Sequence, residues 1–214
     1  MPRPVNADAA ATKQRILDSA LGLFAEKGVD GVSLRELAAN AKVSSAMIHH
    51  CFGGKDGLRQ AAIDTMYSQL NTLSIEMIQL MGPGAELNAT EVFDKAVQVS
   101  FAFTRRHSAS ARLLLRDVIA NGELDERRQA ATNSPFMESI SKRLAEISGL
   151  DRNTLRLSLH SSIILVARYG VSSDQDLMRL TGETEVEAAI TKTDFYLRDA
   201  VRTLMKLPPM QTAS

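Results

Sequence analysis

Apolar residues recur every three or four positions along nearly the whole chain after residue 12, which is the period of an amphipathic helix. The run from Leu58 to Leu80 is the longest example, and the Gly-Pro-Gly sequence at residues 82–84 ends it. No segment alternates apolar and polar residues in the way that a half-buried strand does. We therefore expect an all-α fold of about nine helices, with an N-terminal three-helix unit and a C-terminal antiparallel helical bundle.

Glycine, proline and serine residues divide this pattern into separate helices. Gly28 is expected to end the first helix in a left-handed cap, and Pro135 to kink or interrupt a later helix. The expected helices beyond the first three cover residues 55–81, 90–106, 109–121, 123–148, 152–171 and 184–206, with a short helical turn near 174–181.

Two short helices joined by a tight turn are expected between Ser33 and His50. Ser33 and Glu36 form the S-x-x-E pattern of a reciprocal capping box, and Ser44 can cap the second helix. A single apolar seam would bury one side of this pair and leave the opposite face of the second helix free. That is the geometry by which a helix-turn-helix places a recognition helix in the major groove of DNA.

Composition excludes several other classes of protein. No apolar run approaches the roughly 20 residues that span a bilayer, and the first dozen residues lack the apolar middle of a secretory signal. The single cysteine, Cys51, excludes an intrachain disulfide framework and fits a reducing cytoplasm. We therefore expect a cytoplasmic protein with no membrane partner. The charge balance of 25 basic against 25 acidic residues is no evidence for DNA binding, although residues 1–60 carry eight basic and six acidic groups.

Residues 12–60 resemble the helix-turn-helix region of the tetracycline-repressor (TetR) family of transcriptional regulators. The resemblance lies in the order, spacing and type of residue in three segments: ATKQRILDSALGLFAEKG at 11–28, GVSLRELAANAKVSS at 31–45 and HCFGGKDGL at 50–58. It implies a homodimer that binds palindromic double-stranded operator DNA and acts as a repressor. It also implies that a small-molecule effector, which the sequence does not identify, enters the C-terminal bundle and releases the DNA.

The resemblance assigns DNA contacts residue by residue. Ser33 and Arg35 would touch the DNA from the first helix of the pair, and Lys55 would grip a phosphate at the start of the long helix. Arg35 could also read guanine through its O6 and N7 acceptors. The full set of expected DNA-binding residues is Ser33, Arg35, Ser44, Ser45, Ala46, Met47, His49, His50 and Lys55.

Three positions depart from the usual family pattern. Lys42 stands where a glycine is common, so the turn must form without the backbone freedom of glycine. His49 replaces a phosphate-contacting tyrosine, which makes that contact potentially sensitive to pH. Cys51 replaces a histidine or tyrosine just before Phe52.

Two further sites are expected in the C-terminal bundle. The helices of residues 152–171 and 184–206 are apolar on more than one face, and the resemblance assigns them to a four-helix dimer interface. Burial within one subunit would explain the same pattern. The expected interface residues are Ile163, Ala167, Val186, Ile190, Phe195 and Val201. The expected effector pocket comprises Phe93, Val97, Phe101, Arg112, Phe136, His160 and Arg168, although packing alone explains the spacing of the first three.

The expected organisation is a flexible arm at residues 1–11, a DNA-binding domain at 12–55, an effector-binding and dimerisation domain at 56–207 and a flexible tail at 208–214. No grouping of acid, base and nucleophile indicates an enzyme, so no catalytic residue and no cofactor are expected. His49, His50 and Cys51 are consecutive and diverge around a helix, so they predict no metal site. The alternative function is a helical protein-interaction module without sequence-specific DNA binding.

Overall fold

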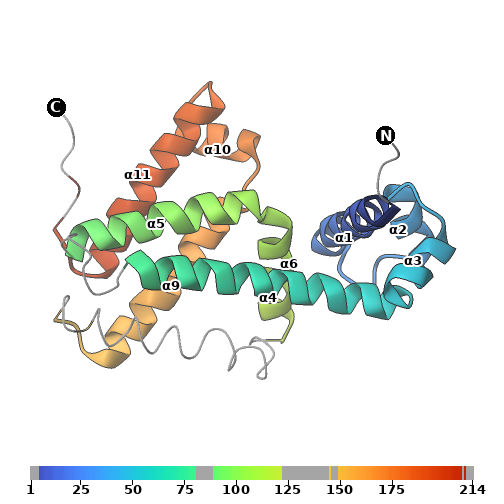
Figure 1. Cartoon of the computed structure of the whole chain (residues 1–214). Helices are drawn as coiled ribbons and strands as arrows, with labels where there is room; N and C mark the ends of the chain where they lie inside the picture. The colour runs from blue at the N-terminus through green and yellow to red at the C-terminus, as the bar shows by residue number, and fades with distance from the viewer. Residues whose placement is uncertain (1–4, 81–88, 122–144, 146–148, 209, 211–214) are drawn as a thin grey trace. The chain divides into compact units, whose positions relative to one another are not determined.

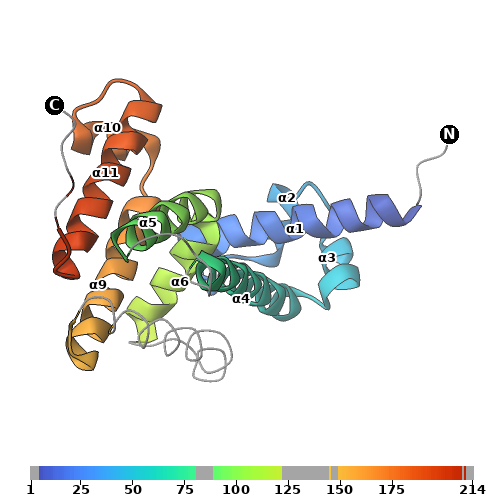
Figure 2. The same cartoon turned by 60° about the vertical axis from the view of Figure 1, so that its left-hand side comes forward.

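The computed structural model describes residues 5–80, 89–121, 145, 149–208 and 210. These described residues form nine α-helices and no strand, so the all-α prediction is confirmed. Figures 1 and 2 show the helices from two directions. Their bounds are α1 (Val5–Lys27), α2 (Leu34–Asn40), α3 (Ser45–Phe52), α4 (Lys55–Leu80), α5 (Ala89–Arg106), α6 (Ser108–Asn121), α9 (Arg152–Gly170), α10 (Asp174–Thr181) and α11 (Val186–Leu204).

Most helix ends lie where the sequence signals predicted them. Gly28 and Gly182 adopt the left-handed conformation, with φ of 75° each, directly after α1 and α10. Both ends of the chain differ from the prediction. Residues 5–11, part of the expected N-terminal arm, form the first turns of α1. In the expected tail, the Pro208 carbonyl accepts a hydrogen bond from Arg202. The expected helix at 123–148, with Pro135 in it, lies almost wholly outside the described residues.

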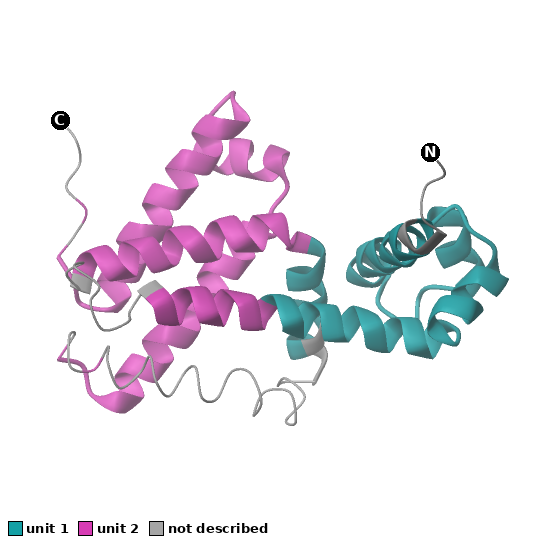
Figure 3. Ribbon diagram, in the orientation of Figure 1, with its two compact units in different colours: residues 1–69, 109–125 teal, residues 70–108, 126–214 magenta. Residues whose placement is uncertain are grey.

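The chain divides into two compact units, coloured separately in Figure 3. Unit 1 comprises residues 1–69 and 109–125, and unit 2 comprises residues 70–108 and 126–214. The expected boundary after residue 55 therefore differs from the boundary between the units. The physical reason is burial: Leu58, Ala62 and Met66, in the first half of α4, are all buried, so this half of the helix completes the core of unit 1.

Unit 2 is a bundle in which α5, α9, α10 and α11 surround one apolar core. Phe93 and Phe101 of α5, Leu155 of α9 and Leu197 of α11 are all in this core, each no more than 4% exposed. Burial of each such side chain stabilises the fold by about 1.5–3 kcal/mol. An ion pair reinforces the α5–α11 packing, because Arg202 Nε donates to Asp94 Oδ1 at 2.8 Å. This hydrogen bond to Asp94 raises the pKa of the Arg202 guanidinium.

The helices α5 and α9 approach each other closely at Gly170. A Cβ atom added at this glycine would lie 2.5 Å from Thr104 Cγ2 and 2.6 Å from Thr104 Cβ, which is too close for any side chain. Thr104 is held in place, because its hydroxyl donates to the Ser100 carbonyl at 2.7 Å. The absence of a side chain at Gly170 therefore sets how closely the two helices pack.

Replacing Gly170 with alanine is expected to lower the free energy of unfolding by about 1–3 kcal/mol, because the added methyl group overpacks the α5–α9 contact. The matched control is Gly22→Ala in α1, where an added Cβ meets nothing within 4 Å. That control should raise stability by about 0.5–1 kcal/mol through helix propensity alone. Denaturant unfolding of both variants checks the prediction, and equal effects at the two sites would contradict it.

Candidate nucleic-acid interface

Serine side chains begin both helices of the predicted pair. Ser33 Oγ accepts a hydrogen bond from the Glu36 amide at 3.1 Å, and Ser44 Oγ accepts one from the Met47 amide at 3.1 Å. The two predicted caps are therefore confirmed. The reciprocal half of the capping box is wrong, because Glu36 Oε1 instead accepts from Lys27 Nζ at 2.5 Å. This hydrogen bond lowers the pKa of the Glu36 carboxyl and raises that of the Lys27 amine.

The turn between α2 and α3 has the geometry of a Schellman motif. The Val43 amide donates to the Ala38 carbonyl at 3.0 Å, and the Lys42 amide donates to the Ala39 carbonyl at 3.2 Å. In this motif the residue at the Lys42 position is left-handed and is usually glycine. Lys42 has a φ of 54°, so it adopts that conformation despite its side chain. Lysine in place of glycine thus leaves the geometry of this turn unchanged, but it strains the backbone at Lys42.

Glycines make the second turn, between α3 and α4. Gly53 and Gly54 have φ values of 74° and 112°, and an added Cβ at Gly57 would lie 1.7 Å from the Phe52 carbonyl oxygen. The His49 ring lies against the backbone of Gly54, since a Cβ there would be 3.0 Å from His49 Cε1. This tight turn places Lys55 at the first residue of α4.

The exposed face of α3 carries four of the nine predicted DNA-binding residues. Ile48 is fully buried and anchors the helix, whereas Ala46, His49 and His50 are exposed and Met47 is 39% exposed. Ser45, the first residue of α3, is partly buried. Outside α3, Ser33, Arg35 and Ser44 are exposed and Lys55 is partly buried. The predicted residues therefore lie on α3, at the start of α2, at the turn before α3 and at the start of α4.

Several basic side chains near this face have structural partners. Arg15 Nε donates to the Ala41 carbonyl at 3.0 Å and Lys27 pairs with Glu36, so both stabilise the helix pair. In the part of the chain that the structure describes, Arg35 and Lys55 form no ion pair with another side chain. Their positive charges are therefore available for an anionic partner.

Arg116 is a structural residue of unit 1 that the sequence did not reveal. From α6 its guanidinium donates to the carbonyl of Glu26 at 3.3 Å and to that of Lys27 at 3.4 Å, at the end of α1. A cation at a helix C-terminus satisfies free carbonyls and interacts favourably with the helix dipole. Gly28 makes room for it, because a Cβ at Gly28 would lie 2.9 Å from Arg116 Nη2.

The residues predicted for the effector pocket lie in different environments. Phe93, Val97 and Phe101 meet in the core of unit 2. His160 and Arg168 are exposed on α9, and Arg168 Nη1 donates to Ser172 Oγ at 2.7 Å. Arg112 is exposed on α6 in unit 1, and Phe136 lies outside the described residues.

The residues predicted for the dimer interface also differ in exposure. Ile163 is 48% exposed, whereas Ala167, Val186, Ile190 and Phe195 are partly buried. Val201 is only 2% exposed and packs in the core of unit 2, because it faces inward from α11. Its apolar character is thus explained by packing within one chain.

Two other kinds of feature are absent from the described residues. No three His, Cys, Asp or Glu side chains among these residues are grouped to hold a metal ion. Within the same ranges, no helix is long and apolar enough to cross a membrane.

Comparison with known proteins finds similarity in the region of this site. The family model for bacterial regulatory proteins of the tetR family matches residues 16–62. The nicotine-responsive transcriptional repressor HdnoR of Paenarthrobacter nicotinovorans is 41% identical over 58 residues, which cover 27% of this chain and only 30% of that protein. The transcriptional regulatory protein RaaS of Mycobacterium tuberculosis is 29% identical over 69% of this chain and 72% of its own.

The fold also matches a solved structure along nearly its full length. A TetR-like transcriptional regulator from Rhodococcus sp. RHA1 aligns with a TM-score of 0.56 and 21% sequence identity. The alignment covers 95% of this chain and 98% of the Rhodococcus protein. At that identity the match concerns the fold alone.

Replacing Lys42 with glycine is expected to raise the free energy of unfolding by about 0.5–1 kcal/mol. The left-handed conformation costs a residue with a Cβ atom about 1–2 kcal/mol, and the greater freedom of glycine in the unfolded chain offsets part of the gain. Lys42→Ala is the matched control, since it removes the charge and keeps the Cβ atom. Denaturant unfolding compares the two, and a glycine variant no more stable than the alanine variant would rule out strain at this turn.

Proposed function

The chain belongs to the TetR family of bacterial transcription regulators, and we propose that it binds palindromic operator DNA as a homodimer and acts as a repressor. The observation that carries this proposal is the geometry of α3. One side chain, Ile48, anchors the helix in the core, and the opposite face is exposed. Arg35 and Lys55 flank this face, and neither forms an ion pair with another side chain among the described residues. Such a helix can enter the major groove of DNA, which is wide enough to admit it.

In this proposal the residues around α3 divide the recognition of DNA between them. Ala46, Met47 and His50 on the exposed face would meet base edges and the thymine methyl group. Arg35 and Lys55 flank the helix and would neutralise phosphates, which fixes the register of the protein on the duplex. Lys55 is well placed for this, because the free amides at the start of α4 also favour an anion.

The dimer would form through the exposed apolar side chains of α9 and α11. Leu157, Ile163 and Ile164 of α9 are 71%, 48% and 49% exposed, and Tyr196 of α11 is 51% exposed. Large apolar side chains exposed together in one patch are typical of a protein–protein contact. Tyr196 packs edge-on against Tyr169 of α9, with ring centroids 5.6 Å apart, which joins the two helices into one surface. Val201 is left out of this interface because it is buried.

We also propose that a small molecule controls DNA binding from unit 2. One relative is named as a nicotine-responsive repressor, which shows that a small molecule acts on that protein. In this chain, α4 contributes residues to both units, and α6 follows α5 of unit 2 directly, although all of α6 after Ser108 belongs to unit 1. A ligand that favours one arrangement of unit 2 could therefore bias the DNA-binding helices through these two helices, and the coupling would be reciprocal.

Replacing Lys55 with alanine should weaken binding to DNA of any sequence and lower the slope of log affinity against log salt by about one unit. The reason is the loss of one phosphate contact and of the counterion released with it. Lys95→Ala on α5 is the control, because Lys95 is exposed and lies far along the chain from the helix pair. Fluorescence anisotropy at several salt concentrations measures both slopes. An unchanged slope for Lys55→Ala would exclude its phosphate contact.

Replacing Ile163 with glutamate should convert the dimer to monomers at micromolar concentration, because the new charge would be buried between two copies of the apolar surface. Ile78→Glu on α4 is the matched control, since Ile78 is equally exposed at 48%. Sedimentation velocity measures both variants and the unmodified protein. The proposed interface fails if the unmodified protein is a monomer, or if the Ile163 variant remains a dimer.

A further inference from the structure

The turn before α3 carries an exposed lysine to which the proposed function gives no role. Among the described residues, the Lys42 amine takes part in no hydrogen bond or ion pair. Its backbone is anchored on both sides. The Ala41 carbonyl accepts from Arg15 Nε at 3.0 Å, and the amides of Lys42 and Val43 make the two bonds of the Schellman motif. The lysine side chain therefore extends into solvent from a fixed point, two residues before the Ser44 cap of α3.

A left-handed lysine is not by itself a sign of function. Lys206, which follows α11 in unit 2, has the same φ of 54°. It also has the same pair of backbone hydrogen bonds, made by its own amide at 3.1 Å and by the Leu207 amide at 2.8 Å. What distinguishes Lys42 is the surface around it. Residues 37–55 contain no Asp or Glu, so the turn, α3 and the start of α4 contribute only neutral and basic side chains.

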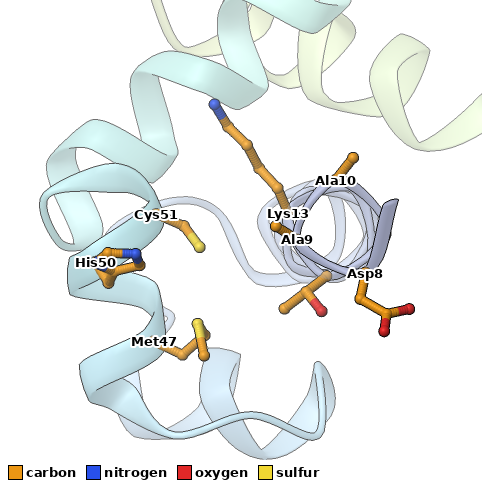
Figure 4. A pocket seen from close by; sticks show the side chains of 8 residues that line it. Asp8, Ala9, Ala10, Lys13, Met47, His50 and Cys51 are labelled. Carbon is orange, nitrogen blue, oxygen red and sulfur yellow. The ribbon is translucent and has the colours of Figure 1, made fainter. Parts of the chain in front are cut away.

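The side of α3 that faces α1 is less suited to a phosphate. Figure 4 shows Asp8 and Lys13 of α1 lining the groove between the two helices. The Asp8 carboxylate would repel a phosphate there. The Lys13 amine already lies over the Phe52 ring, 5.6 Å from its centroid. The places where a phosphate would meet a lysine without an ion-pair partner are therefore the two ends of α3.

We propose that the Lys42 amine binds a DNA phosphate, as the counterpart of Lys55 at the opposite end of α3. The eight residues of α3 make a helix about 12 Å long, and the major groove is about 12 Å wide between its two sugar–phosphate backbones. A helix of that length laid across the groove has one end near each backbone. Lys42 and Lys55 would then neutralise phosphates of opposite strands and add no base preference of their own. This inference rests on the proposed function.

The contact gives the position two effects of opposite sign. Glycine at residue 42 would relieve the backbone strain but supply no charge, whereas lysine carries the strain and supplies a phosphate contact. The variant Lys42→Gly is therefore expected to be more stable than the unmodified protein and to bind DNA more weakly. Partial unfolding of the variant cannot produce that combination.

The test is fluorescence anisotropy of the full-length protein with a labelled duplex of mixed sequence at several salt concentrations, because phosphate contacts do not depend on sequence. Lys42→Ala and Lys42→Gly should each bind about five- to ten-fold more weakly in about 0.1 M salt. Each should also lower the slope of log affinity against log salt by about one unit per bound chain. Lys42→Arg keeps the charge and should retain both the affinity and the slope.

Lys206→Ala is the matched control, because it removes a lysine with the same backbone conformation from unit 2. It should change neither the affinity nor the slope. An unchanged slope in Lys42→Ala, in a protein whose Lys55→Ala variant does lose slope, overturns the Lys42 contact and leaves the proposed function standing. A loss in Lys42→Gly without one in Lys42→Ala also overturns the contact, because flexibility of the turn would then be the cause. Absence of salt-dependent DNA binding in the unmodified protein overturns both the contact and the proposed function.

Discussion

The proposed DNA-binding face depends on the burial of one side of an eight-residue helix. A helix as short as α3 is not stable alone in water, so its position must come from caps, turns and packing. Ile48 supplies the packing, because it is fully buried in unit 1, and Ser44 supplies the cap. The remaining surface of the helix is thereby left to solvent in a fixed orientation, which is what a recognition helix requires.

The two turns around α3 fix that orientation, and the turn before α3 does so with a strained backbone at Lys42. Lys42 adopts a conformation that glycine adopts without strain, and Gly53 and Gly54 have positive φ in the loop after α3. Gly57, in the first turn of α4, has no room for a side chain, because an added Cβ would lie 1.7 Å from the Phe52 carbonyl oxygen. Arg116 adds a third constraint from α6 by capping the end of α1. Because α6 follows α5 of unit 2 directly along the chain, Arg116 connects the end of α1 to a helix that is continuous with unit 2.

The sequence predicted the features that local signals determine. The caps at Ser33 and Ser44, the left-handed cap at Gly28 and the bounds of α4 and α10 each follow from residues within one or two helical turns. The partner of Glu36 was missed because Lys27 reaches it across a turn, nine residues away. Contacts of longer range gave no signal at all: Arg116 is 89 residues from Lys27. Nor could periodicity assign Val201 to the core, because a core face and an interface face are equally apolar.

The central claim is that α3 reads DNA as one half of a symmetric pair. The most direct measurement is selection of bound duplexes from a random pool by the full-length protein, followed by sequencing. The account predicts a two-fold symmetric consensus whose half-sites are centred about one helical turn, roughly 34–36 Å, or a multiple of it apart. Failure to enrich any sequence, or enrichment of a single half-site without symmetry, would contradict it.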